Sequence, residues 1–108
     1  MATSGDFVRI AMALEGTVQA PHFDRSAFKV ARTYATLAPG GASANLKFDA
    51  AEQEFKCLLA PDAFAPVSGG WGRMGWTAAI LANLSPEELA AALEMAWRHA
   101  LPRKPTKG

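Results

Sequence analysis

Residues 17–48 read TVQAPHFDRSAFKVARTYATLAPGGASANLKF, and this stretch decides the fold. Short segments of alternating apolar and polar residues are separated in it by turn signals, of which Pro39-Gly40-Gly41 is the clearest. Alternation places successive side chains on opposite faces of a strand. The pattern predicts strands at Thr17–Ala20, Ala27–Val30, Tyr34–Leu37 and Ala44–Phe48. Because turn-length connections join these strands, we expect an antiparallel meander.

Three helical segments flank these strands. The first runs from about Asp6 to Glu15, where apolar residues recur at helical spacing. The second begins at Asp49 and the third at Ser85, each with the spacing of a capping box, an N-cap acceptor followed three residues later by a carboxylate. The residues expected to be buried are Phe7, Ile10, Ala11 and Leu14 in the first, Phe55, Leu58 and Leu59 in the second, and Leu89, Ala92, Leu93, Ala96, Trp97 and Ala100 in the third.

A loop of unusual composition precedes the third helix. Residues 69–77 read GGWGRMGWT, so that four glycines force a sharp turn between Trp71 and Trp76, with Arg73 between them. After the loop, Trp76, Ala78 and Ile80 alternate as in a strand that buries all three, although the alanine-rich segment also fits a helix. The loop either fixes how the next segment docks or contacts a partner.

The order of these elements predicts an α+β fold, with an antiparallel sheet covered by helices on one face and open to solvent on the other. A chain of 108 residues suits a single domain over residues 1–108, with loosely ordered tails at 1–5 and 102–108. The formal net charge of +1 excludes a strongly basic protein. No apolar run is long enough to span a bilayer, and no secretory signal is evident. We therefore predict a cytoplasmic protein without membrane contact, a monomer or weak dimer.

Motifs of catalysis and cofactor binding are incomplete. Gly70-x-Gly72-x-x-Gly75 has the spacing of a dinucleotide-binding loop, but the required strand before it and helix after it are missing. Cys57 fits a packed thiol inside a helix. Neither His22 nor His99 has a second histidine or a carboxylate at ligand spacing. We therefore predict no enzyme activity, no cofactor and no metal.

One group of side chains remains that could form a binding surface. Alternation places Lys29, Asn45 and Lys47 on the side away from the predicted core, and Arg25, Arg32 and Arg73 lie in adjoining turns. Together with Tyr34, Trp71 and Thr77, they could contact phosphates and stack on bases. The alternative is that exposed strand lysines only maintain solubility and prevent edge pairing.

Five blocks of the sequence resemble, in order and spacing, those of the MmcQ/YjbR-like proteins: APHF at 20–23, AFKV at 27–30, YATL at 34–37, ANLK at 44–47 and WGRMGWT at 71–77. The resemblance covers nearly the whole chain and implies a frataxin-like α+β fold. It also implies double-stranded DNA as a partner, contacted by strand hairpins that act as a double wing, and it brings no catalytic residues. The positions that match and could touch DNA are Lys29, Arg32, Asn45, Lys47 and Arg73. Iron binding by such a fold needs an acidic ridge on the first helix, which offers only Asp6 and Glu15.

A second interpretation is a protein-interaction or small-ligand module. Here the Trp71–Trp76 loop acts as an aromatic anchor, with Trp71, Arg73 and Tyr34 as contacts to an unknown partner. The exposure of Trp71 tests this interpretation, because a buried Trp71 would leave it without its anchor. Exposure of Trp71 and Arg73 beside Lys29 and Lys47 would indicate a binding surface rather than a structural latch.

Overall fold

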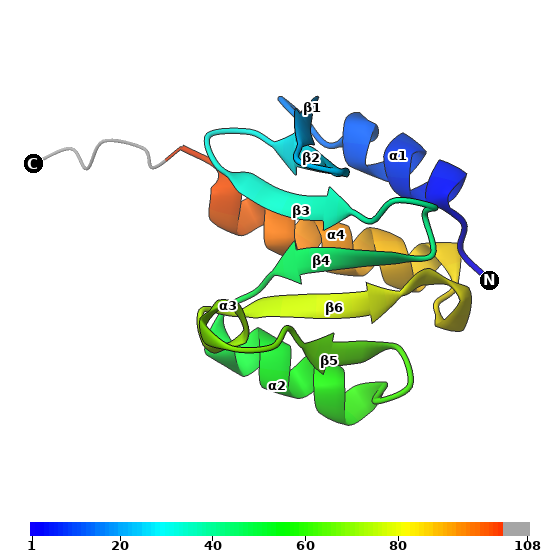
Figure 1. The fold of residues 1–108 in the computed structure, drawn as a ribbon, viewed down its shortest axis with the longest axis vertical. Helices are drawn as coiled ribbons and strands as arrows, with labels where there is room; N and C mark the ends of the chain where they lie inside the picture. Colours follow the sequence, from blue (N-terminus) through cyan, green and yellow to red (C-terminus); the bar gives the residue numbers. More distant parts are fainter. Residues whose placement is uncertain (103–108) are drawn as a thin grey trace, which may run out of the picture.

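The computed structural model describes residues 1–102 as a six-stranded antiparallel sheet with helices on one face (Figure 1). The strands are β1 (Val18–His22), β2 (Arg25–Lys29), β3 (Thr33–Leu37), β4 (Ser43–Lys47), β5 (Phe64–Pro66) and β6 (Trp76–Ile80), in the order β1-β2-β3-β4-β6-β5. The helices are α1 (Ser4–Ala13), α2 (Ala50–Leu59), α3 (Gly70–Arg73) and α4 (Pro86–Ala100), with a 3-10 turn, η1, at Leu81–Asn83. The predicted α+β class is confirmed, and the part of the predicted C-terminal tail at 103–108 lies outside the described residues.

The first four strands form the expected meander. In the centre of the sheet Ala35 pairs with Leu46, and Leu46 pairs with Thr77, so these three residues face the helices together. The register of β2 against β3 shifts after Phe28, which leaves Tyr34 as an extra residue of a bulge. The hydroxyl of Tyr34 reaches Thr17 Oγ1 (2.9 Å) and the carbonyl oxygen of Ala11 (3.4 Å), which ties β3 to α1.

The N-termini of the three long helices are built alike. Each has a complete capping box, in which the N-cap side chain accepts a bond from the N3 amide and the N3 carboxylate accepts one from the N-cap amide. The pairs are Thr3 with Asp6, Asp49 with Glu52, and Ser85 with Glu88. The second and third were predicted, whereas α1 begins earlier than expected because Thr3 is its N-cap.

Residues 1–5 are held by the fold, so the prediction of a loose N-terminal tail is wrong. Ala2 is buried, and its amide donates a 2.7 Å hydrogen bond to the carbonyl oxygen of Leu84. Thr3 then caps α1. The residues of this segment are mostly small and polar, but contacts with the start of α1 and with Leu84, just before α4, hold the segment in place.

The hydrophobic core lies between the sheet and the helices α1 and α4 (Figure 1). The predicted stripe of α4 is buried at Leu89, Ala92, Leu93, Ala96 and Ala100. In α1, Phe7 meets Phe28 of β2 edge to face, with ring centroids 5.3 Å apart. Within residues 1–102, none of the helices combines the length and hydrophobicity that a membrane span needs.

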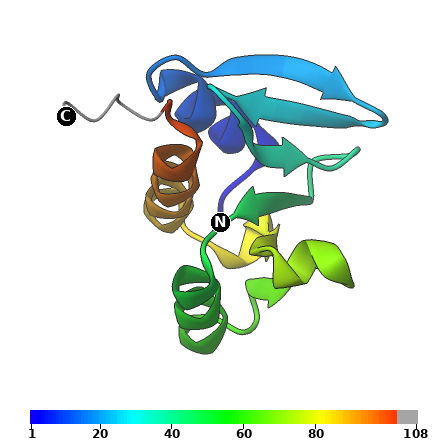
Figure 2. The same ribbon diagram turned by 90° about the vertical axis from the view of Figure 1, so that its left-hand side faces the viewer.

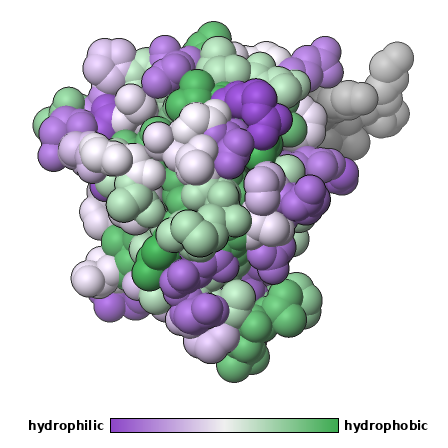
Figure 3. All heavy atoms as spheres, turned by 90° about the vertical axis from the view of Figure 1, so that its right-hand side faces the viewer, coloured by the Kyte–Doolittle hydropathy of each residue, from purple (hydrophilic) through white to green (hydrophobic). Residues whose placement is uncertain are grey.

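Helix α2 does not bury the residues predicted for its core face. Phe55, Leu58 and Leu59 are all exposed, Leu58 by 75%, and no residue of α2 is fully buried. The reason is its position, because α2 lies beside the edge strand β5 rather than over the centre of the sheet (Figure 1). Figure 3 shows the resulting apolar area at the lower edge of the molecule, over α2.

Strand β6 forms as predicted, but its two faces are reversed. Thr77 and Ala79 point to the helices and are fully buried, whereas Trp76 and Ile80 lie on the opposite face. The Thr77 hydroxyl donates to the carbonyl oxygen of Gly75 (3.0 Å), so its burial leaves no unsatisfied group. The prediction that Trp76 enters the core is therefore wrong, and a large indole is added to the open side of the sheet.

Candidate nucleic-acid interface

The helix-free side of the sheet, here called the open face, is flanked by two projecting parts. Figure 2 shows the β1–β2 hairpin and α3 extending on the side opposite to α1, α2 and α4. Strand register assigns to this face His22, Arg25, Ala27, Lys29, Thr36, Asn45, Lys47, Trp76, Ala78 and Ile80. The face therefore carries cations, aromatic rings and small residues.

The glycine-rich loop is locked to the fold by close backbone contacts. A Cβ on Gly72 would lie 1.9 Å from the carbonyl oxygen of Val67, and one on Gly75 would lie 1.9 Å from that of Phe48. Gly75 also has a φ of +103°, which L side chains rarely adopt. These two glycines allow the loop to approach the backbone of Val67 and Phe48 closely. This packing explains why glycines occur here, so the resemblance to a dinucleotide-binding motif needs no nucleotide.

The locked loop presents Trp71 to solvent over the open face. Trp71 is 61% exposed, and its ring lies edge to face with that of Trp76, with centroids 6.5 Å apart and planes at 75°. The two indoles, with His22, Arg25 and Thr36, line a cavity of about 120 Å³, here called the tryptophan notch. Arg25 is fixed beside the rings, because its Nε donates to Thr36 Oγ1 (2.9 Å) and its Nη2 to the Thr36 carbonyl oxygen (3.3 Å).

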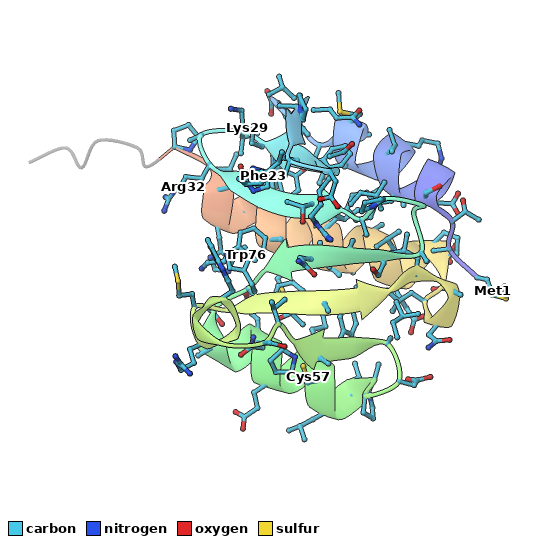
Figure 4. The ribbon with its side chains drawn as sticks, viewed as in Figure 1. Met1, Phe23, Lys29, Arg32, Cys57 and Trp76 are labelled. Atoms are coloured by element: carbon cyan, nitrogen blue, oxygen red, sulfur yellow. The ribbon has the colours of Figure 1, made fainter. Side chains whose placement is uncertain are left out.

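A larger cavity opens at the end of the sheet where β3 begins and α4 ends. It has a volume of about 510 Å³, and we call it the basic cavity because Arg32, Lys47 and Arg98 line it. Trp76 lines both this cavity and the tryptophan notch, so the two adjoin at its indole. In Figure 4, Lys29, Arg32 and Trp76 lie along the same side of the molecule.

One rim of the basic cavity is acidic. His99 Nε2 lies 2.6 Å from Glu52 Oε1 and 4.0 Å from Asp49 Oδ2. Sequence spacing missed this contact because the histidine and Glu52 are 47 residues apart. The three side chains could ligate a cation, but both carboxylates already cap α2, and the hydrogen bond with Glu52 accounts for His99.

The predicted contact residues are distributed over this surface with two exceptions, Tyr34 and Thr77, since Thr77 is fully buried on the helix side of β6 and its predicted contribution is therefore wrong. Lys29, Asn45 and Lys47 lie on the open face, Arg32 is exposed in the β2–β3 loop, and Arg73 is exposed in α3. Tyr34 is fully buried by its bonds to α1 and Thr17, so the prediction that it contributes to a binding surface is wrong. Burial raises the pKa of the Tyr34 hydroxyl.

Sequence reasoning missed part of the surface. His22 lines the tryptophan notch, and Phe23 projects from the tip of the β1–β2 hairpin with 94% of its surface exposed. Arg25 was expected in a turn but begins β2. The signal that could have located them is Asp24, a turn residue that places its neighbours at a hairpin tip.

The strands of the described chain carry basic but no acidic side chains. Arg25, Lys29 and Lys47 are strand residues, and Asp24 is an acidic residue in the turn between β1 and β2. Within residues 1–102 the ion pairs involve only helix residues and Asp49: Arg9 with Asp6, Arg98 with Glu94, and His99 with Glu52 and Asp49. The five cations on and around the open face, Arg25, Lys29, Arg32, Lys47 and Arg73, form none with the described residues.

Comparison with known proteins places the chain in a family. A sequence model described as YjbR matches residues 12–99. The chain belongs to the YjbR family. A similar solved structure is that of the Deinococcus radiodurans protein DR2400, which is assigned to the domain family DUF419. The two structures have a TM-score of 0.76 and 22% sequence identity, and the match covers 89% of this chain and 76% of the DR2400 chain. At that identity the likeness shows the fold alone. No curated protein matches this YjbR family member.

Proposed function

We propose that this YjbR family protein binds nucleic acid through the open face of its sheet. The observation that carries the proposal is the set of five cations around that face that form no ion pair with residues 1–102, Arg25, Lys29, Arg32, Lys47 and Arg73. Cations without such a pair can replace the counterions of phosphates, and this release supplies most non-specific affinity. The strands themselves carry no acidic residue that would repel a polyanion, and Asp24 lies in the turn between β1 and β2.

The shape of the open face supports the same proposal. The β1–β2 hairpin and α3 flank the open face, so a strand or duplex lying along it would meet cations from both parts. Phe23 at the hairpin tip has a φ of 58° and is almost fully exposed. A non-glycine residue in this conformation is uncommon, and apolar side chains at such tips can enter a groove or stack on a base.

The proposal assigns no catalytic step and places the protein in the cytoplasm. Burial raises the pKa of the Cys57 thiol, which packs against the core, so it is not poised as a nucleophile. His99 is held by Glu52. A single free cysteine suits a reducing compartment.

The test is the salt dependence of binding to a short DNA duplex. Five phosphate contacts predict that log affinity falls against log salt with a slope of about −4 to −5. Replacing Lys29, Lys47 and Arg73 together by Ala should weaken binding and reduce the slope by about 0.9 per cation. The matched control removes charge from helix positions that line neither cavity, with Arg9 and Lys56 replaced by Ala.

The control double variant should keep the slope of the wild type. Binding without salt dependence would contradict the proposal. So would an equal loss of affinity per removed charge in the triple and the control variant, because net charge alone would then explain the binding.

The exposure of Trp71 favours a second candidate, a module that binds a protein or small ligand through the Trp71–Trp76 loop. Trp71 and the adjacent Met74 are both more than half exposed, as a hot spot with an aromatic anchor requires. Binding of this kind should survive nuclease treatment of a cell extract. It should be lost in Trp71→Ala and kept in Lys29→Ala; the reverse result would exclude this candidate.

A further inference from the structure

We infer that the tryptophan notch holds one unpaired nucleobase, so that the protein binds a single strand of DNA or RNA more tightly than a duplex of the same length. The inference rests on the proposed function and adds a contact to the base itself, where the five cations provide contacts to phosphate. It is carried by the arrangement of Trp71, Trp76 and Arg25.

The two indoles form a corner that fits one planar ring. Their planes meet at 75° with centroids 6.5 Å apart, so a ring stacked on one indole presents its edge to the other. Both offset stacking and edge-to-face contact are favoured geometries for aromatic rings. The notch has a volume of about 120 Å³. An engineered cavity that binds benzene, a single six-membered ring, has a volume of roughly 150 Å³, so the notch is of similar size.

Polar groups for the edge of that ring are supplied by Arg25. Its bonds to Thr36 use Nε and Nη2 and hold the guanidinium in place, which leaves its other N–H donors without a partner in the described chain. Such donors can bond the carbonyl oxygens and ring nitrogens that bases carry. His22 closes the notch, and its ring is fixed edge to face against Phe23 at 4.9 Å.

The notch selects an unpaired base because it contacts the face of the ring. In a duplex, both faces of each base are covered by neighbours, and the grooves expose only the edges. A base in the corner formed by Trp71 and Trp76 must therefore leave the stack of its neighbours. This unstacking costs much less free energy in a single strand than in a duplex, where the base must also break its pair. Because Trp76 also lines the basic cavity, the adjoining phosphates of the same strand would lie near Arg32 and Lys47.

The experiment compares four end-labelled ligands of equal length by fluorescence anisotropy: oligothymidylate, oligouridylate, an abasic deoxyribose-phosphate strand and a DNA duplex. Oligothymidylate should bind more tightly than the abasic strand, which has the same phosphates and no bases. The duplex should also bind more weakly. Equal affinity for oligouridylate would assign recognition to the ring that the two bases share, and a preference for either strand would assign part of it to the sugar or to the thymine methyl group; both results support the notch.

Variants separate the notch from the cations. Trp71→Ala should weaken oligothymidylate binding about 5- to 150-fold, the range of one base–aromatic stack. It should leave the affinities for abasic strand and duplex unchanged, and Trp71→Phe should restore part of the loss. Met74→Ala is the matched control, because Met74 is equally exposed in the same loop but does not line the notch.

Two results would overturn the inference while leaving the proposed function intact. One is salt-dependent binding in which the abasic strand or the duplex binds as tightly as oligothymidylate. The other is a Trp71→Ala variant that binds oligothymidylate like the wild type, while replacement of Lys29, Lys47 and Arg73 weakens it. If no nucleic acid binds with salt dependence, the proposed function fails and the notch inference with it.

Discussion

The side-chain amide of Gln53 lies 2.9 Å from the carbonyl oxygen of Gly72, so that helix α2 holds the loop that presents Trp71. The same Nε2 lies 3.2 Å from the carbonyl oxygen of Trp76. Helix α2 has no fully buried residue, and this amide is one of its polar attachments to the rest of the fold. Stability and the geometry of the tryptophan notch are therefore coupled at Gln53.

We expect Gln53→Ala to lower the free energy of unfolding by about 0.5–1.5 kcal/mol, because the carbonyl oxygens of Gly72 and Trp76 each lose one hydrogen bond and keep a backbone donor. Urea denaturation followed by tryptophan fluorescence measures this change. Gln19→Ala is the control, since Gln19 is exposed on the edge strand β1. Equal stability of the two variants would show that the amide does not hold the loop.

Gly72→Ala should destabilise the fold by about 1–3 kcal/mol or more, because the added methyl overlaps the Val67 carbonyl oxygen. Gly70→Ala, two residues earlier, should be close to neutral, since its Cβ would meet only the end of the Arg73 side chain at 3.9 Å. Thermal melts of the two variants side by side check this difference. A neutral Gly72→Ala would mean that α3 can move away from Val67.

Stability should fall at acid pH partly through Glu88. Its carboxylate accepts a 2.8 Å bond from the Ser85 amide, and this bond with the Ser85 side-chain bond holds the pKa of Glu88 below its ordinary value of 4.5. A lowered pKa in the folded state stabilises the protein above the ordinary pKa, and this contribution is lost as pH falls through the folded pKa.

Glu88→Gln should therefore be less stable than the wild type at neutral pH and equally stable well below the folded pKa. Unfolding midpoints across acid pH measure this. Glu87→Gln is the control and should lose less stability at neutral pH than Glu88→Gln, because the capping hydrogen bonds of Ser85 involve Glu88 and not Glu87. A Glu88→Gln variant that loses stability with falling pH as the wild type does would contradict the assignment.

The exposed residues of α2 should tolerate polar substitution. Leu58→Gln should change the free energy of unfolding by less than about 0.5 kcal/mol, because 75% of Leu58 is already in solvent. Leu93→Ala in α4 should cost about 2–5 kcal/mol, because Leu93 is fully buried. A large loss in Leu58→Gln, measured by urea denaturation, would show that α2 buries its apolar side in solution, for example against a second copy.

Local sequence signals predicted much of this fold. The alternation in residues 17–48 gave the four strands of the meander, and the capping boxes at Asp49 and Ser85 gave the starts of α2 and α4. These features depend on residues a few positions apart, so their physics is contained in a short segment. The same alternation predicted that Lys29 and Lys47 lie on the face of the sheet that points away from the core.

What could not be predicted depends on contacts between distant segments. Trp76 was expected inside because it is large and apolar, but the approach of Gly75 to Phe48 fixes the start of β6, and Thr77 is satisfied inside by Gly75. The bulge that buries Tyr34 depends on the register of β2 against β3. The meeting of His99 with Glu52 joins two helices, and no local pattern contains it.

The three capping boxes have a consequence for where an anion can dock. A helix N-terminus normally attracts phosphate through its free amides and its dipole. At α1, α2 and α4 the N3 amide instead donates to the N-cap side chain, and the N3 carboxylate of Asp6, Glu52 or Glu88 lies at the helix N-terminus, where it accepts from the N-cap amide. The three N-termini of the described chain thus carry negative charge at positions that would otherwise attract a polyanion, which leaves the sheet as the more favourable side for such a ligand.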